Sequence, residues 1–222
     1  MTTRKTARPA ATPERMETIL ERLEARFPDA RCSLDFENPL QLLVATILSA
    51  QCTDERVNMV TPTLFARFRT AQDFADADPD ALEAIIRPTG FYRNKTRSLI
   101  GMGRALAERH GGEVPRTMEA LTQVPGAGRK TANVVLGNAF GVEEGIVVDT
   151  HVSRISQRLG LTRHTDPVRI EQDLLTLVPR GRWTLFPHLM IHHGRAICRA
   201  RTPQCEACPL NDVCPFPARP AA

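Results

Sequence analysis

The residues best suited to chemistry lie in one short stretch, LTQVPGAGRKTANVVLGNAFG. Lys130 is the second residue after Pro-Gly-Ala-Gly, at the expected start of a helix. The chain has three lysines against twenty-six arginines, so lysine is an unusual choice at this position. The positive end of a helix dipole disfavours a cation in the first turn, and Arg129 adds a like charge. Both effects favour the neutral amine, which is nucleophilic; simple contact with phosphate is the alternative role.

The turn before Lys130 joins two expected helices, residues 117–123 and 130–140. Gly126 and Gly128 let the backbone turn tightly and approach another surface without a Cβ clash. Backbone N–H groups at such a turn, ahead of a helix N-terminus, bind phosphate. The pattern is that of a helix-hairpin-helix motif, which holds the DNA backbone without reading sequence. An ordinary hairpin of two helices has the same turn residues, so the motif alone leaves both interpretations open.

A carboxylate follows the hairpin at a similar helix start. Asp149 in IVVDTHVSR precedes the expected helix THVSRISQRLG, where it would serve as N-cap. An ionised carboxylate held there could also stabilise positive charge at a sugar C1′, as in glycoside cleavage. We therefore expect Asp149 to combine a structural and an electrostatic role.

Four cysteines near the C-terminus form the most specific pattern in the chain, C-x6-C-x2-C-x5-C. They are Cys198, Cys205, Cys208 and Cys214. Four thiolates can hold a structural zinc or a 4Fe–4S cluster. Zinc sites more often pair two C-x2-C units. Here one C-x2-C unit is separated from the other two cysteines by spacers of six and five residues, which suits a bulkier cluster. Disulfides would be unusual in the cytoplasm, where this chain is expected because it has no secretory signal.

Isolated polar residues give weaker signals. Gln51 in ILSAQCTD ends a very apolar helix and could project into DNA. His151, His192 and His193 have no partner at ligand spacing, so we expect them at the surface or in contact with phosphate.

The elements that must position these residues are nearly all helices. Thr12-Pro13, Asn38-Pro39, Asp78-Pro79 and Asp166-Pro167 are start signals, an N-cap followed by proline. Apolar residues recur at helical spacing after each of them. No useful strand alternation is present. The sequence predicts an all-α fold of about ten helices, with a short basic tail over residues 1–11.

Composition is that of an ordinary globular protein, with 42% hydrophobic and 24% charged residues. No apolar run approaches the roughly 20 residues that span a bilayer. The net charge is only +4, but it is unevenly distributed: residues 87–104 and 180–201 each carry five basic residues and no acid. Such segregated charge suits a polyanion partner, although solvated arginine-rich faces are the simpler explanation.

Together these motifs resemble one family. LTQVPGAGRKTANVV, VVDTHVSR and the four-cysteine spacing, in this order, are similar to the endonuclease III family of bifunctional DNA glycosylases. ILSAQCTD and TGFYRNK also resemble segments of that family, so the resemblance covers the chain from about Thr12 to Cys214. The interval from Lys130 to Asp149 is about one residue longer than the family pattern because of VEEG, which adjusts a loop.

The resemblance implies two helical domains flanking a DNA cleft. One is a six-helix barrel over residues 32–143, with the helix-hairpin-helix at 117–140. The other is an iron–sulfur cluster helical domain, residues 12–31 plus 144–222. The implied partner is duplex DNA containing damaged bases or abasic sites, bound by a monomer in the cytoplasm, associated with the nucleoid.

The resemblance also implies a base excision repair activity and its residues. Lys130 would form a Schiff base with the sugar, and β-elimination would cleave the strand 3′ to the abasic site. Asp149 would be the essential carboxylate and Gln51 a wedge that fills the gap left by an oxidised pyrimidine. The remaining implied residues are Gly126, Gly128, Arg129 and His151 for DNA binding, and Cys198, Cys205, Cys208 and Cys214 for a 4Fe–4S cluster.

Three alternatives stay open on the sequence. A monofunctional adenine or mismatch glycosylase on the same scaffold would be expected to lack the hairpin lysine. A non-catalytic helix-hairpin-helix DNA-binding protein would not need Lys130 together with Asp149. A zinc-tailed interaction protein would contain zinc in place of iron.

Overall fold

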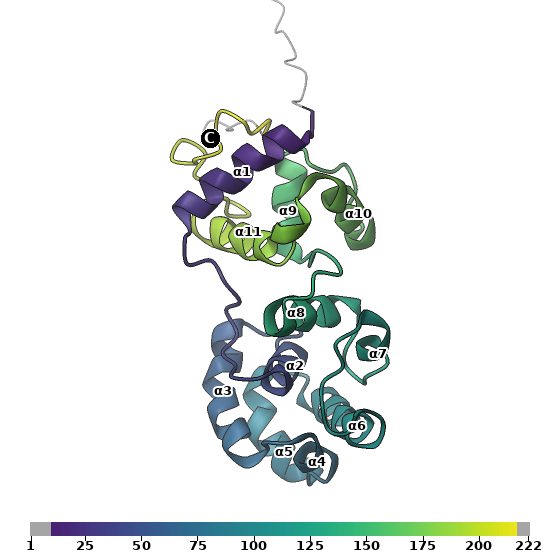
Figure 1. Ribbon diagram of the computed structural model, residues 1–222. Helices are drawn as coiled ribbons and strands as arrows, with labels where there is room; N and C mark the ends of the chain where they lie inside the picture. The colour runs from purple at the N-terminus through teal and green to yellow at the C-terminus, as the bar shows by residue number, and fades with distance from the viewer. Residues whose placement is uncertain (1–9, 217–222) are drawn as a thin grey trace, which may run out of the picture. The chain divides into compact units, whose positions relative to one another are not determined.

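The computed structural model describes residues 10–216, and within them the chain is helical, with no strand (Figure 1). Eleven α-helices and two short 3-10 helices follow one another in this part of the chain. The predicted all-α class is therefore confirmed. Residues 1–9 of the predicted basic tail lie outside the described residues. No helix within residues 10–216 is long and apolar enough to cross a membrane.

The described chain divides into two compact units. The hairpin unit spans Cys32–Glu144, and the cysteine unit combines the described residues of Met1–Arg31 and Gly145–Ala222. The hairpin unit contains α2 (Pro39–Leu48), α3 (Asp54–Arg67), α4 (Ala71–Ala75), α5 (Pro79–Ile86), η1 (Arg87–Thr89), α6 (Tyr92–His110), α7 (Met118–Thr122) and α8 (Arg129–Phe140). The cysteine unit contains α1 (Pro13–Arg26), α9 (Thr150–Arg158), α10 (Pro167–Leu177), η2 (Arg180–Arg182) and α11 (Leu185–Ala196).

Polar side chains start the helices where the sequence predicts. The Thr12 hydroxyl accepts a hydrogen bond from the backbone N–H of Arg15 at 3.3 Å. The Asn38 side chain accepts from Gln41 N–H at 3.0 Å. Asp78 and Asp166 cap α5 and α10 in the same way. Each cap satisfies an N–H group that the first helical turn leaves without a partner, and proline follows where no donor is needed.

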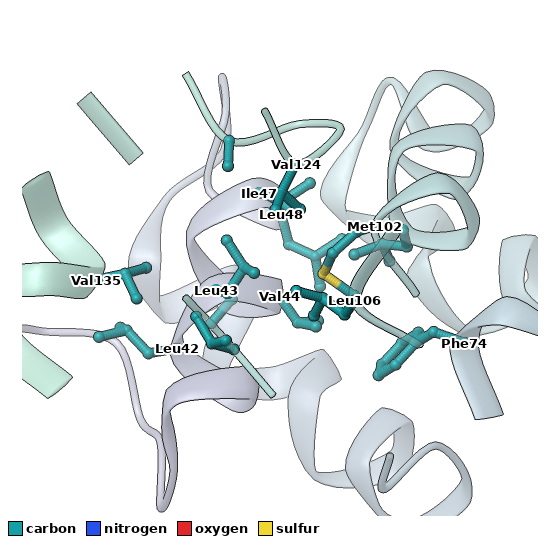
Figure 2. Packing of buried hydrophobic residues seen from close by; sticks show 14 of the residues in the cluster. Leu42, Leu43, Val44, Ile47, Leu48, Phe74, Met102, Leu106, Val124 and Val135 are labelled. Atoms are coloured by element: carbon teal, nitrogen blue, oxygen red, sulfur yellow. The ribbon is translucent and has the colours of Figure 1, made fainter. Parts of the chain in front are cut away.

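Helix α2 is the centre of the hairpin unit. Seven of its ten residues are buried, so it is apolar nearly all round. It contacts α3, α6 and α8. Figure 2 shows Leu42 on the side of Val135 of α8, and Val44 on the side of Met102 and Leu106 of α6. Burial in every direction fixes α2, so the turn at its C-terminal end, which carries Gln51, starts from a rigid element.

The cysteine unit has its own apolar core, built from two ends of the chain. Residues of α1 pack with residues of α9, α10 and α11 in one cluster. Met16, Ile19, Leu20 and Leu23 form the buried stripe of α1. Helix α9 contributes Val152 and Ile155, which lie three and six positions after Asp149. The apolar face of α9 thus anchors the helix whose first turn carries the candidate carboxylate.

Candidate functional site

The two glycines of the hairpin have different structural roles. Gly126 has a φ of 83°, and a Cβ there would lie 3.1 Å from both Ile47 Cδ1 and Ser98 Cβ. The fold itself therefore requires glycine at this position. Gly128 has a φ of −72°, and a Cβ there would meet no atom within 4 Å. Packing within the chain does not explain Gly128, so its backbone is open to an external ligand.

Lys130 is the second residue of α8 and is exposed, as is Arg129 before it. Gly128 is the N-cap, and it provides no side chain to bind the N–H groups of the first turn. Such an uncapped helix start, preceded by a glycine turn, presents donors to an anion. The structure thus brings together backbone N–H groups without a side-chain cap and an accessible primary amine on one turn.

Asp149 is the N-cap of α9, as predicted. Its Oδ1 accepts a hydrogen bond of 2.8 Å from Val152 N–H, and the residue is half-buried. The cap fixes the direction of the side chain. Lys130 belongs to the hairpin unit and Asp149 to the cysteine unit, so each residue is positioned by the core of its own unit.

Gln51 lies in the turn between α2 and α3. It is exposed and has a φ of 53°, in the left-handed region that residues other than glycine avoid. Only one other non-glycine residue among residues 10–216 has a positive φ, Phe91 with 48°. Phe91 directly precedes α6 and is 62% exposed. Two exposed side chains therefore project from strained turns of the same unit, a feature that hydrophobic periodicity could not indicate.

His151 is the second residue of α9. Its Nδ1 lies 3.2 Å from Arg154 Nη2, which also donates to the carbonyl of Cys198 at 3.2 Å. A Cβ at Gly194 of α11 would clash with His151 Nδ1, so glycine at 194 makes room for the ring. His151 is thus linked through Arg154 to the start of the cysteine-rich segment.

The four C-terminal cysteines line one small cavity, together with apolar residues that include Ile155 and Leu159. None of them forms a disulfide. Burial raises the pKa of the Cys208 and Cys214 thiols, and the neighbouring thiols raise it further. Without a cation, four neighbouring thiols resist deprotonation because the thiolates would repel one another. A bound iron group would instead stabilise the thiolate form. Within residues 10–216, no three metal-binding side chains are grouped as ligands of a single ion. The four thiols around this cavity fit the four cysteine ligands of a 4Fe–4S cluster.

Arginines hold the cysteine loop, defined here as residues 198–214, by its backbone carbonyls. Arg158 donates to the carbonyls of Arg199 at 2.8 Å and Ala200 at 2.7 Å, and its Nη1 lies 3.3 Å from Cys198 Sγ. Arg15 of α1 donates to Val213 O at 3.0 and 2.7 Å. Sequence reasoning missed both residues, because their partners are up to 198 positions away.

The surface position expected for His193 is wrong. His193 is 2% exposed, and its Nε2 lies 3.8 Å from Cys208 Sγ. Burial lowers the pKa of His193 to about 4, so the ring is neutral at physiological pH. Its spacing was a partial signal, since His193 lies four residues after Leu189 on the buried face of α11.

Comparisons with known proteins agree with this geometry. The model of the HhH-GPD superfamily base excision DNA repair protein matches residues 44–180, and that of the iron-sulfur binding domain of endonuclease III matches residues 198–214. Endonuclease III of Synechocystis sp. is 53% identical over 206 residues, which are 93% of this chain and 94% of the relative. Endonuclease III of Bacillus subtilis is 43% identical, over 90% of this chain and 92% of the relative.

Solved structures give the same result. A trapped endonuclease III–DNA covalent intermediate has a TM-score of 0.87 at 44% identity, and a non-covalent endonuclease III–DNA complex has a TM-score of 0.88 at the same identity. Each match covers 93% of this chain and 97% of the solved one. The chain therefore belongs to the endonuclease III family, the DNA glycosylases with AP lyase activity that act in base excision repair, and residues 198–214 are its 4Fe–4S cluster-binding domain.

Proposed function

We propose that Lys130 is the nucleophile of this glycosylase and AP lyase, and that its substrates are oxidised pyrimidines and abasic sites in duplex DNA. The observation that carries the proposal is the exposed amine of Lys130 on the first turn of α8, directly after a hairpin whose Gly128 backbone is open to a ligand. An amine at this position can reach a sugar whose flanking phosphates are bound by the same turn.

Binding begins at the phosphates. The N–H groups of the hairpin and of the first turn of α8 bind a backbone phosphate, with Arg129 nearby. His151, at the start of α9, is a second candidate contact. Because this affinity comes from charge neutralisation, it decreases steeply as salt increases.

The damaged nucleotide then rotates out of the stack, which costs least when its pairing or stacking is already weakened. Gln51 fills the gap that the nucleotide leaves. Its left-handed backbone directs an exposed side chain away from the end of α2. Phe91 has the same backbone signature and an exposed ring, which suits stacking on bases.

The chemistry is covalent. The neutral amine of Lys130 forms a bond to C1′ while the glycosidic bond breaks and the base leaves with the electron pair. Asp149 stabilises the positive charge that develops on the sugar. The C1′–O4′ bond then breaks, the nitrogen loses its proton and O4′ gains one, which opens the sugar ring and gives an imine. The imine acidifies the C2′ proton, and removal of that proton expels the 3′ phosphate by β-elimination. A 44% identical relative has been trapped as a covalent intermediate with DNA, which supports this scheme.

The iron–sulfur cluster is not used in these steps. Cys198, Cys205, Cys208 and Cys214 would hold it, and when bound it supplies iron–thiolate bonds that fix the cysteine loop. Arg158 and Arg15 bind the carbonyls of this loop and of its surroundings. The consequence is a rigid loop whose exposed Arg199 and Arg201 are available for DNA.

We also propose that the chain acts as a monomer in the cytoplasm, associated with the nucleoid. A single chain provides both candidate catalytic residues, so no second copy is needed for the reaction. Sedimentation of the protein with and without a damaged duplex would test this state.

Borohydride reduction tests the nucleophile. The wild type is expected to give a covalent protein–DNA adduct on an oxidised-pyrimidine duplex and on an abasic duplex, and Lys130→Ala is expected to give none. Arg129→Ala is the matched control, because it removes the neighbouring exposed cation; it should weaken binding but still give the adduct at saturating protein.

Two results would contradict the proposal. An adduct at the wild-type level with Lys130→Ala would exclude Lys130 as the nucleophile. Base release by the wild type without strand cleavage would favour a monofunctional glycosylase. Asp149→Asn retains an N-cap and loses the charge, so it should slow base release without lowering helix stability.

A further inference from the structure

A second lysine of the chain is buried in the hairpin unit. Lys95 of α6 is only 4% exposed. Its Nζ donates to the carbonyl of Leu48 at 2.7 Å and to the carbonyl of Thr89 at 2.8 Å. Both bonds require only two N–H groups, so they can form whether or not the amine carries its third proton.

These two carbonyls belong to the last residues before the turns that carry Gln51 and Phe91. Leu48 is the last residue of α2, three positions before Gln51. Thr89 is the last residue of η1, two positions before Phe91. Gln51 and Phe91 are the two non-glycine residues with positive φ in the described chain. One nitrogen atom therefore joins the backbones from which both exposed side chains project.

Core stability alone is a poor explanation for this lysine. An apolar side chain of similar length would fill the position without the free-energy cost of burying an amine, and burial lowers the pKa of Lys95. The thiol of Cys52, in the Gln51 turn, acts in the opposite direction but more weakly. The cost is offset by hydrogen bonds to helix-terminal carbonyls, where the negative end of a helix dipole favours a cation.

We propose that Lys95 is a positioning residue for base extrusion, one that holds the Gln51 turn and the Phe91 turn at a fixed spacing. The inference rests on the proposed function, because it assigns these two turns to the distortion of duplex DNA. It does not depend on Lys130, since extrusion precedes the chemical step. Two side chains that insert at a base step, or stack on it, must keep a fixed separation if both are to separate the stacked bases.

Lys95→Met tests this, because methionine is of similar length and makes neither hydrogen bond. The duplex carries the damaged base beside 2-aminopurine, whose fluorescence increases when its neighbour unstacks. We expect Lys95→Met to reduce this increase and to slow single-turnover base release at least about tenfold, while abasic-site cleavage changes much less. Thr96→Val is the matched control, a buried change of similar volume on the same helix; it should change neither quantity.

The dependence on the two turns is tested separately. In a protein with both Gln51→Ala and Phe91→Ala, adding Lys95→Met should cause no further loss of base release, because Lys95 acts through those turns. If Lys95→Met does not fold, Lys95→Gln replaces it in these experiments. Its amide keeps two N–H donors, so we expect smaller decreases in the fluorescence response and in the rate of base release than a complete loss of both hydrogen bonds would cause.

Three results would overturn the inference. They are an unchanged fluorescence response with Lys95→Met, equal losses of base release and abasic-site cleavage, and a full additional loss in the Gln51→Ala, Phe91→Ala background. A wild type that unstacks the duplex but releases no base would contradict the proposed function and leave the positioning role supported. A wild type that does not unstack the duplex would contradict the inference.

Discussion

The glycine hairpin and the cysteine loop are two non-helical segments that carry candidate site residues, and they are stabilised in different ways. The hairpin, residues 123–128, is fixed by packing: Val124 and Ala127 are buried, and Gly126 lies against Ile47 and Ser98. The cysteine loop is fixed by donors, since arginines from α1 and α9 bind its carbonyls. Because apolar packing holds the hairpin, its backbone N–H groups stay available for a ligand. Hydrogen bonds from arginines to carbonyls, in contrast, allow a loop with few buried apolar residues to surround a cofactor.

Gly126→Ala should cause the largest change in stability. The new Cβ would require a left-handed alanine and would press on Ile47 and Ser98 at 3.1 Å. Strain and overpacking together should lower the free energy of unfolding by about 2–4 kcal/mol. Denaturant unfolding of the iron-loaded protein measures it. A loss no greater than that of Gly141→Ala, at a positive φ without neighbours within 4 Å, would contradict the packing argument.

Arg158→Met should have the next largest effect, on the cysteine loop. The change removes the donors to two loop carbonyls and the contact with Cys198 Sγ. Hydrogen bonds from a charged group contribute about 1.5–3 kcal/mol each, so we expect a less stable loop and a lower iron content per chain.

Iron analysis and the absorbance near 400 nm of the purified protein test this prediction. Arg199→Met is the control, because Arg199 is an exposed arginine of the same loop whose side chain donates only to Arg195 O among the bonds described. Equal iron contents in the two variants would mean that the hydrogen bonds from Arg158 to the loop carbonyls do not stabilise the loop.

The sequence predicts the hairpin better than it predicts the loop. Gly126 and Lys130 are local signals, and the helix starts at Thr12, Asn38, Asp78 and Asp166 follow from residues within three positions. Arg15 and Arg158 bind carbonyls far away in the chain, and every arginine can do so, so no pattern singles them out. The four cysteines indicate a metal site but not the side chains that support it.

The burial of Lys95 was likewise beyond prediction, and that of His193 was indicated only by its spacing from Leu189 on α11. Lysine is mostly exposed in proteins and histidine is intermediate. Only the packed structure reveals the carbonyls of Leu48 and Thr89 beside Lys95, and the thiol of Cys208 beside His193. The strained backbones of Gln51 and Phe91 arise in the same way, because tertiary contacts and not local preference impose a positive φ.

Gly128→Ala should separate binding from stability in the hairpin. A Cβ there meets nothing within 4 Å, so the free energy of unfolding should change by less than about 1 kcal/mol, the usual cost of alanine at an N-cap. Affinity for an abasic duplex should nevertheless decrease, because the methyl group faces the approaching phosphate. Fluorescence anisotropy over a salt series measures it, and unchanged affinity would show that the DNA does not approach this backbone.

The smallest effect is expected for an exposed ion pair at the edge of the cysteine loop, Arg22 of α1 with Asp212. The hydrogen bond from Arg22 lowers the pKa of Asp212 below its usual 3.8. The ion pair therefore stabilises the protein at pH values above 3.8, and this contribution disappears as the pH falls through the lowered pKa. Salt screens exposed pairs, so Arg22→Met should alter stability little at low salt and less at high salt.

A carboxyl NMR titration gives the sharper measurement. In Arg22→Met the titration midpoint of Asp212 should move up toward 3.8, whereas that of Asp73, which is hydrogen-bonded to the backbone of Arg69 and Thr70 in the other unit, should not move. Arg22 also donates to the carbonyl of Pro209 at 3.0 Å. If Arg22→Met lowers the iron content while Asp212→Asn does not, that carbonyl bond, and not the ion pair, is what Arg22 contributes to the loop.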